Sequence, residues 1–349
     1  MKRTKKALAF LLMVVLCMAL APAAALATPE DTAPRAMEID LTKLTVSDTK
    51  PGFTFTAQEV EISFTADALE SMKKLATTLK FGKEANLIIF ELTDKNGEDA
   101  DWYDYVNPVT ISVLYTPPQD ITTHQVVLTE EDGTVIPRSL YSGGRVYAKI
   151  HESDKYSVAV KSLGNFTDTK NLWMNEAVGY MFVRDVVQGV GGGLFDVNGT
   201  ITRAHFVTML MRALNLDLDY EEAMPPEDYE SAPDWAKEAI RKATALGLTL
   251  RDEDGNFNPS APILRQEMFF IAYEAMGACG MLPDMFTMEW IIFSDWEGNV
   301  KGEYAGAIQN LCKLGLVKGP GGGALNPNGK STRAEGAQLI YNILKYDAK

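Results

Sequence analysis

Ser331-Thr332-Arg333-Ala334-Glu335 precedes a run of apolar residues at helical spacing that extends through Ile343. The Thr332 hydroxyl can accept a hydrogen bond from the backbone N–H of Glu335, while the Glu335 carboxylate can reach back to the Thr332 N–H. This reciprocal arrangement, a capping box, predicts that a helix begins at Arg333. Because such a short helix is unstable alone, its apolar stripe has to pack against other parts of the chain.

The same pattern occurs three times when the chain is aligned on Arg203, Arg265 and Arg333. One apolar residue lies 25 positions before each arginine and another lies eight positions before it, without a gap. These residues are Val178, Ile240 and Ile308 at the first position and Phe195, Phe257 and Leu325 at the second. The copies are 62 and then 68 residues apart, so the insertions fall between them. An internal repeat of this kind predicts three units that pack on one another.

Strand patterns dominate before residue 165. Val60–Phe64 alternates apolar and polar residues, which is typical of a half-buried strand. β-branched and aromatic residues predict further strands at 86–90, 109–115, 146–150 and 156–160. One helix is predicted over 66–79, and Asp132-Gly133 suits a hairpin turn between strands at 126–128 and 135–136. We therefore expect a mainly-β, sandwich-like domain over residues 38–164.

The first residues have the pattern of a secretory signal. Four cations precede an apolar run that ends near Leu20, and Ala25-Leu26-Ala27 places small residues where a signal peptidase cleaves. We expect residues 1–27 to be a signal peptide and residues 28–37 a linker. A membrane anchor is disfavoured because the apolar run is shorter than the ~20 residues that a spanning helix needs. No later apolar run is long enough either, so no membrane span is expected after cleavage.

Charge and cysteine content narrow the class of partner. Removing the four cations of the signal takes the net charge from −14 to −18. A chain this acidic repels nucleic acid and anionic membranes, so neither is an expected partner. Only Cys279 and Cys312 remain, which is too few for a disulfide framework. Free thiols are favoured over one bridge between them.

The repeated motifs resemble the S-layer homology family. That pattern is roughly Phe-x-Asp, Trp-Ala, a helix, a turn with glycine, Phe-x-Pro, and Ile-Thr-Arg-Ala-Glu at the start of a second helix. The first copy contains Phe166-Thr167-Asp168, Trp173, Gly189 and residues 201–205. The second contains Trp235-Ala236, Phe257-Asn258-Pro259 and residues 263–267, and the third contains Phe293-Ser294-Asp295, Gly319, Leu325-Asn326-Pro327 and residues 331–335.

This resemblance implies a multidomain protein with repeats at 165–220, 221–285 and 286–349. It also implies that the repeats form an all-α pseudo-threefold trimer with grooves between neighbouring units. Residues 146–158 resemble the end of a β-domain that often precedes such repeats in secreted bacterial proteins.

The resemblance further implies a secreted surface protein, held non-covalently on the cell wall by secondary cell-wall polysaccharide. In this family the polymer often carries pyruvate ketals; other surface proteins are a second class of partner. A helix N-terminus and an adjacent arginine suit such an anion. The predicted polysaccharide-binding residues are Arg203, Arg265, Arg333, Trp173, Trp235, Gly189, Gly319, Thr202 and Thr332.

Each of these roles has a structural alternative. The arginines can bridge to an acidic residue of the neighbouring repeat, the tryptophans can lie in the core, and the threonines cap helices whatever binds. The copies also differ: Leu264 replaces the capping threonine and Arg251 stands in the glycine column, so the second groove is expected to be structural. His205 replaces the glutamate of the first copy and weakens its cap.

No catalytic site, metal or cofactor is predicted. The three histidines lack metal-ligand spacing, and the glycine runs 191–193 and 321–323 lack the Gly-Lys-Ser/Thr of a phosphate loop. The acidic segment Asp94–Asp104 is interpreted as a solvated turn, because its glycine is misplaced for a calcium loop. We predict a non-catalytic protein whose β-domain is structural or binds a partner. The alternative is a wall-anchored hydrolase or carbohydrate-binding protein with its activity in the β-domain.

Overall fold

The computed structural model describes residues 36–45, 52–283, 287 and 289–348. The predicted signal peptide and most of the predicted linker therefore lie outside the described residues. Within these ranges, none of the helices combines the length and apolar character needed to cross a bilayer.

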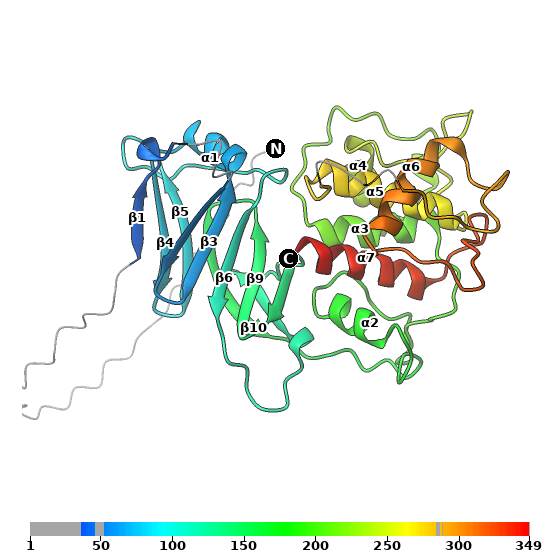
Figure 1. Ribbon diagram of the computed structural model, residues 1–349, viewed down its shortest axis with the longest axis horizontal. Helices are drawn as coiled ribbons and strands as arrows, with labels where there is room; N and C mark the ends of the chain where they lie inside the picture. Colours follow the sequence, from blue (N-terminus) through cyan, green and yellow to red (C-terminus); the bar gives the residue numbers. More distant parts are fainter. Residues whose placement is uncertain (1–35, 46–51, 284–286, 288, 349) are drawn as a thin grey trace, which may run out of the picture. The chain divides into compact units, whose positions relative to one another are not determined.

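Two five-stranded antiparallel sheets form the N-terminal domain (Figure 1). The strand order is β1-β4-β5-β10-β7 in one sheet and β2-β3-β6-β9-β8 in the other. The strands are β1 (Met37–Asp40), β2 (Gly52–Ala57), β3 (Val60–Thr65), β4 (Thr78–Glu84), β5 (Leu87–Thr93), β6 (Val109–Leu114), β7 (Val126–Glu130), β8 (Ser139–Ser142), β9 (Arg145–Ile150) and β10 (Asp154–Val160). Ile62 and Ile111 of one sheet share a buried core with Phe81 and Phe90 of the other. The prediction of a sandwich-like domain is confirmed.

The predicted helix over residues 66–79 is too long. Helix α1 (Ala66–Lys73) begins where the Thr65 hydroxyl accepts a hydrogen bond from the Ala68 N–H, at 3.1 Å, and it ends before Leu75, which is exposed. Leu79 belongs to β4, where it is buried and lies opposite Leu92 of β5. Sheet pairing therefore outweighed the helical spacing of the leucines, because β4 pairs with β1 on one side and with β5 on the other, which satisfies its backbone groups along both edges.

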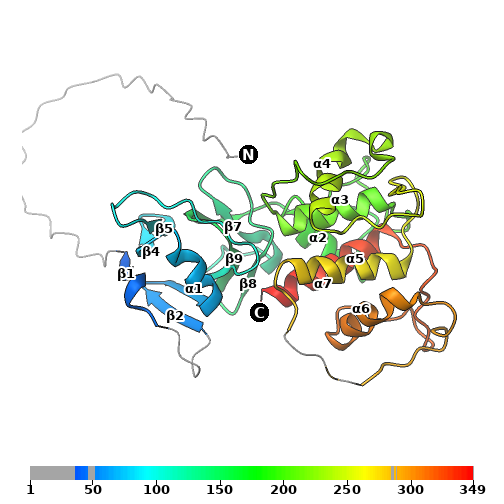
Figure 2. The same ribbon diagram turned by 90° about the horizontal axis from the view of Figure 1, so that it is seen from above.

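Pairs of helices form the repeats of the C-terminal half (Figure 2). The helices are α2 (Asn175–Phe182), α3 (Arg203–Leu214), α4 (Asp234–Ala245), α5 (Arg265–Ala278), α6 (Gly302–Lys313) and α7 (Arg333–Asp347). Short 3-10 helices lie at Leu41–Lys43 and Thr123–Gln125 in the N-terminal domain and at Tyr229–Ser231 in the second repeat. One apolar core runs through all three repeats and includes Phe195, Phe257 and Leu325. These are the apolar residues that lie eight positions before each arginine.

The prediction that this half is an all-α trimer is wrong. Isolated β-bridges join the extended segments that precede α3, α5 and α7. The backbone N–H of Ile201 donates to Ser331 O at 3.0 Å, that of Ser331 donates to Ile263 O at 3.0 Å, and that of Ile263 donates to Ile201 O at 3.1 Å. The three bonds form a closed ring. Buried backbone groups need partners, and just before a helix begins the helix itself cannot supply them, so the segments pair with one another.

Candidate functional site

The second helix of each repeat begins with a cap that differs between the copies. In the third copy the Thr332 Oγ1 accepts from the Glu335 N–H at 3.2 Å, and the Thr332 N–H donates to Glu335 Oε2 at 2.9 Å, which confirms the predicted capping box. In the second copy only the glutamate half is present, since Leu264 has no side-chain acceptor. In the first copy, His205 Nδ1 lies 2.7 Å from the Thr202 Oγ1, which also accepts from the His205 N–H.

Each repeated arginine extends into the neighbouring repeat, where it contacts the same loop position. The acceptor is the carbonyl oxygen that lies fifteen residues before that repeat's own arginine. The Nη2 distances are 2.6 Å from Arg203 to Leu250 O, 3.3 Å from Arg265 to Lys318 O, and 3.0 Å from Arg333 to Gln188 O. The three arginines therefore have one shared geometry, which ties each repeat to the next.

Two of the three arginines also form an ion pair. Arg203 Nη1 lies 2.9 Å from Glu267 Oε1, and Arg265 Nη1 lies 2.6 Å from Glu335 Oε1. Glu267 and Glu335 are the glutamates that cap α5 and α7. Both arginines are buried, with exposed fractions of 9% and 6%. At these two junctions the arginine therefore forms an ion pair with the neighbouring repeat. This is the structural role that was predicted as the alternative to contact with the polymer.

The third arginine, Arg333, lies at a junction without that glutamate. His205 occupies the corresponding position, two residues after Arg203. Arg333 Nε donates to Phe195 O at 3.1 Å, but no hydrogen bond joins its Nη1 to any residue in the described ranges. Burial lowers the pKa of the Arg333 guanidinium, with Asp196 acting in the opposite direction. Arg333 is half-buried, so its guanidinium is more accessible than those of the other two.

The two predicted tryptophans lie on the surface rather than in the core. Trp173 has an exposed fraction of 61% and Trp235 one of 46%. The Trp235 ring packs against the His205 ring, with centroids 4.6 Å apart. Burial, and secondarily the charge of Arg333, lower the pKa of His205. The core alternative therefore does not describe either tryptophan.

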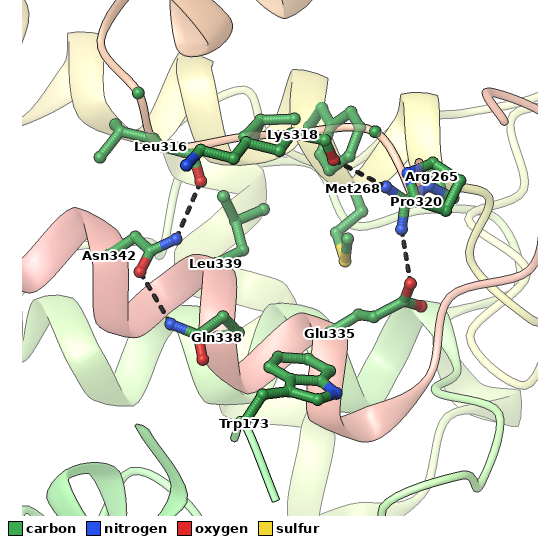
Figure 3. A pocket seen from close by; sticks show the side chains of 14 residues that line it. Trp173, Arg265, Met268, Leu316, Lys318, Pro320, Glu335, Gln338, Leu339 and Asn342 are labelled. Carbon is green, nitrogen blue, oxygen red and sulfur yellow. Dashed lines mark hydrogen bonds and ion pairs between the residues drawn. The ribbon is translucent and has the colours of Figure 1, made fainter. Parts of the chain in front are cut away.

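A cavity of about 470 Å³ lies between the second and third repeats, and Trp173 of the first repeat lies at its edge (Figure 3). It is lined by Arg265, Met268 and Phe269 of α5, by residues 315–320 of the loop after α6, and by Glu335, Gln338, Leu339 and Asn342 of α7. The structure thus brings together predicted residues from three different copies, namely Trp173, Arg265 and Gly319. An exposed indole beside polar side chains is suited to a sugar ring, because the ring stacks on the aromatic face while its hydroxyls form hydrogen bonds.

Two amide side chains of α7 contribute to the cavity and were not predicted. Gln338 Nε2 donates to Asn342 Oδ1 at 2.8 Å, and Asn342 Nδ2 donates to Leu316 O at 2.9 Å (Figure 3). These bonds fix both amides at the cavity wall. The sequence did contain a signal for these two residues, because polar residues five and nine places after Arg333 lie one turn apart on the same helix.

The two predicted glycines are needed by the loop itself. A Cβ at Gly319 would collide with the carbonyl oxygen of Ala324, and one at Gly189 would lie 2.8 Å from Leu194 O. Gly319 also lines the cavity. In the second repeat, Arg251 in the glycine column is exposed and donates to Met224 O.

An aspartate braces each repeat, and one of the three was missed. Asp168 and Asp295 accept hydrogen bonds from the backbone N–H groups of residues 195–197 and 325–326, and Asp228 accepts in the same way from residues 257–258. The hydrogen bond from Leu325 lowers the pKa of Asp295. Asp228 escaped notice because Glu227 precedes it where the other copies place Thr167 and Ser294, with no phenylalanine two positions before.

Comparison with known families gives three matches, all in this half of the chain. Residues 165–207, 228–269 and 292–337 match the model of the S-layer homology domain. They contain the three arginines, both tryptophans and the ring of extended segments described above.

Curated relatives match about half of the chain. The chain is 32% identical to an amylopullulanase from Thermoanaerobacterium thermosulfurigenes, over 52% of this chain and 9% of the relative. It is 30% identical to exoglucanase XynX from Acetivibrio thermocellus, over 55% of this chain and 17% of the relative. A cellulosome-anchoring protein of Acetivibrio thermocellus is 27% identical over 46% of this chain and 35% of the relative. The chain thus spans less than a fifth of the first two relatives.

Proposed function

Since three S-layer homology domains make this a protein of the bacterial cell surface, we propose that they hold it non-covalently on secondary cell-wall polysaccharide. The anchoring region itself is not catalytic. The expectation of an acidic polymer, with pyruvate ketals as the acidic group, is part of the same proposal.

The observation that carries the proposal is the cavity between the second and third repeats. Its volume of about 470 Å³ is within the range of small-molecule sites and accommodates one or two sugar residues. Trp173 supplies an exposed stacking surface, and the amides of Gln338 and Asn342 supply donors and acceptors for hydroxyl groups. Because Arg265 is already paired with Glu335, we assign to this cavity the neutral part of the polymer.

The N-terminal domain is proposed to be structural or to bind another surface molecule. Two relatives with hydrolase names resemble this chain. A third is named as an anchoring protein, which supports other surface proteins as a second class of partner for this chain. No feature of the described β-domain specifically favours catalysis.

The test is sedimentation of the chain with purified bacterial cell walls, either intact or stripped chemically of their attached polysaccharide. We expect the chain to sediment with intact walls and to stay in solution with stripped walls. Trp173→Ala should weaken binding about tenfold, because the stacking of one ring is worth on the order of 1–2 kcal/mol.

Trp290→Ala is the matched control, since Trp290 is also an exposed tryptophan of the repeat region, at 62%, but does not line the cavity. Binding that persists on stripped walls would contradict the proposal. So would Trp173→Ala and Trp290→Ala variants that bind intact walls equally well.

A further inference from the structure

One sheet edge of the N-terminal domain differs from the other three. Its two open sheets have four edge strands, which are β1, β7, β2 and β8. An edge strand has unpaired backbone N–H and C=O groups, which make it a site where another strand can add to the sheet. Native proteins protect such edges by charge, by a short length or by a cover, so an edge without protection indicates a partner.

Three of the four edges are protected. Strand β1 has only four residues, and its Glu38 and Asp40 are exposed acidic side chains. Strand β7 is covered by residues 134–136, which form backbone hydrogen bonds with it. Strand β8 also has only four residues, and the Tyr180 hydroxyl donates to Ser139 O at 2.6 Å.

Strand β2 has none of these protections. Its six residues, Gly-Phe-Thr-Phe-Thr-Ala, pair with β3 without a bulge and include neither a charge nor a proline. Among the described residues, only those of β3 pair with it (Figure 2). Thr54 and Thr56 are exposed, and threonine has a high preference for strands. A short, uncharged segment of high strand preference is well suited to pair with another strand.

Two half-buried phenylalanines lie along the same edge. Phe53 and Phe55 alternate with the exposed threonines, and both rings stack on the buried Phe64 of β3, with centroids 5.5 and 5.9 Å from its ring. The Phe53 and Phe55 rings are parallel to within 3°. The aromatic row therefore reaches the last strand of the sheet and ends there partly in solvent. A strand that completes this row has to place aromatic residues opposite them.

We propose that β2 pairs in antiparallel orientation with β2 of a second copy of this chain, which joins the two sheets into one. The partner strand has to be uncharged, because β2 offers no charge to complement, and it has to alternate aromatic with small polar residues. Among the described edge strands, β2 itself meets both conditions. The inference goes beyond the proposed anchoring and does not depend on it.

The alternation of side chains restricts the register of this pair. Residues directly opposite each other in antiparallel strands lie on the same face, so the twofold axis has to pass through a residue. An axis at Thr54 places Phe53 of each copy opposite Phe55 of the other and gives two aromatic pairs. An axis at Phe55 gives one such pair and places Phe53 opposite Ala57. We therefore assign the axis to Thr54.

A pair of this kind is weak in solution but effective on a surface. A single edge contact belongs to the small interfaces of less than about 1,200 Å², so we expect a dissociation constant in the micromolar range. Copies that are held on one cell wall have a high effective concentration, which allows weak pairing to link neighbours in twos.

The experiment is sedimentation velocity of the chain without residues 1–27, at concentrations from about 1 to about 200 μM. We expect the wild-type chain to shift from monomer to dimer over this range. Thr54→Lys adds an exposed cation that faces its own copy across the axis, so the dissociation constant should rise by about tenfold or more. Thr134→Lys is the matched control, because it adds the same charge at an exposed position of the same domain.

Thr54→Cys tests the register by a covalent bond. With the axis at Thr54, the two introduced thiols lie opposite each other at a Cα separation that a disulfide spans, so oxidation should link the dimer. Thr56→Cys lies opposite Gly52 of the second copy and should stay unlinked. The unsubstituted chain is the control for Cys279 and Cys312.

A wild-type chain that stays monomeric at every concentration would overturn the inference and leave the edge to a strand of another protein. So would a Thr54→Lys variant that dimerises as readily as the wild type and Thr134→Lys. Linking of Thr56→Cys as readily as Thr54→Cys would contradict the assigned pairing. Wall binding is measured separately by sedimentation with cell walls, so each of these results leaves the proposed anchoring intact.

Discussion

The junction of Arg265 with Glu335 and the junction of Arg333 with His205 have the same backbone construction and opposite electrostatic outcomes. At the first, Arg265 donates from Nε, Nη1 and Nη2, and a glutamate neutralises it. At the second, the carbonyl contacts are kept while the carboxylate is missing. A single difference in a helix cap, His205 in place of a glutamate, therefore distinguishes a candidate anion site from an ion pair that holds two repeats together.

The junction between the first and second repeats adds a third variant. Arg203 is paired with Glu267, and Phe270, at the position of Gln338, packs on Tyr304 with ring centroids 4.7 Å apart. An aromatic pair thus fills the space that the cavity leaves open. Three copies of one motif have diverged into a filled junction, an open cavity and a cationic site.

The strongest test of this comparison is the loss of a locked arginine. Arg265→Ala leaves Glu335 without its partner and removes hydrogen bonds to two carbonyl oxygens, so we expect a loss of about 3 kcal/mol in the free energy of unfolding. Urea denaturation followed by circular dichroism measures it. A loss below about 1 kcal/mol would mean that the ion pair does not hold the repeats together.

The open junction should respond less. Arg333→Ala leaves no carboxylate unpaired and removes bonds to the carbonyl oxygens of Phe195 and Gln188, so we expect a loss of about 1–2 kcal/mol. The same denaturation experiment measures it beside Arg265→Ala. Equal losses in the two variants would remove the energetic distinction between the junctions.

Restoring the glutamate should convert one kind of junction into the other. His205→Glu completes the capping box with Thr202 and offers a carboxylate to Arg333, and we expect a gain of about 1 kcal/mol in the free energy of unfolding. Thermal unfolding at neutral pH detects the gain. A destabilised variant would show that the histidine is itself part of the packing against Trp235.

The smallest effect on stability is expected at the cavity edge. Trp173 is 61% exposed, so Trp173→Ala should change the free energy of unfolding by no more than about 0.5 kcal/mol while it weakens wall binding. Denaturation and sedimentation on the same preparation separate the two quantities. A large loss of stability would place Trp173 in the packing of the repeats instead.

Local signals in the sequence were sufficient for much of the fold. The capping box at Thr332 and the alternation in Val60–Phe64 each depend on neighbouring residues, and both occur as predicted. Strands β2 and β8 pair only with the strands that follow them, β3 and β9, and were missed although that pairing is local. The end of α1 and strand β1 depend on pairing between distant segments, which single-sequence patterns do not reveal. The ring of β-bridges was missed for the same reason, because Ile201, Ile263 and Ser331 lie 62 to 130 residues apart.

The site was predictable in its parts but not in its assembly. Alignment of the copies located the arginines, tryptophans and glycines, since these recur at fixed spacing. It could not show that Trp173 lies at the edge of the cavity lined by Arg265, Gly319 and Gln338, because that depends on how the copies pack. His205 was noted as a defect of a cap, and its significance emerges only when Arg333 of another copy lies at the same junction.

Binding of the Arg333→Ala variant to intact cell walls tests the central claim most directly. Lys95→Ala is the matched control, because it removes one exposed cation from the β-domain and leaves every junction unchanged. The account predicts that Arg333→Ala binds about tenfold more weakly than the wild-type chain, since a charge-assisted hydrogen bond is worth on the order of 1.5–3 kcal/mol, while Lys95→Ala binds normally. Wild-type affinity in a folded Arg333→Ala variant would contradict it.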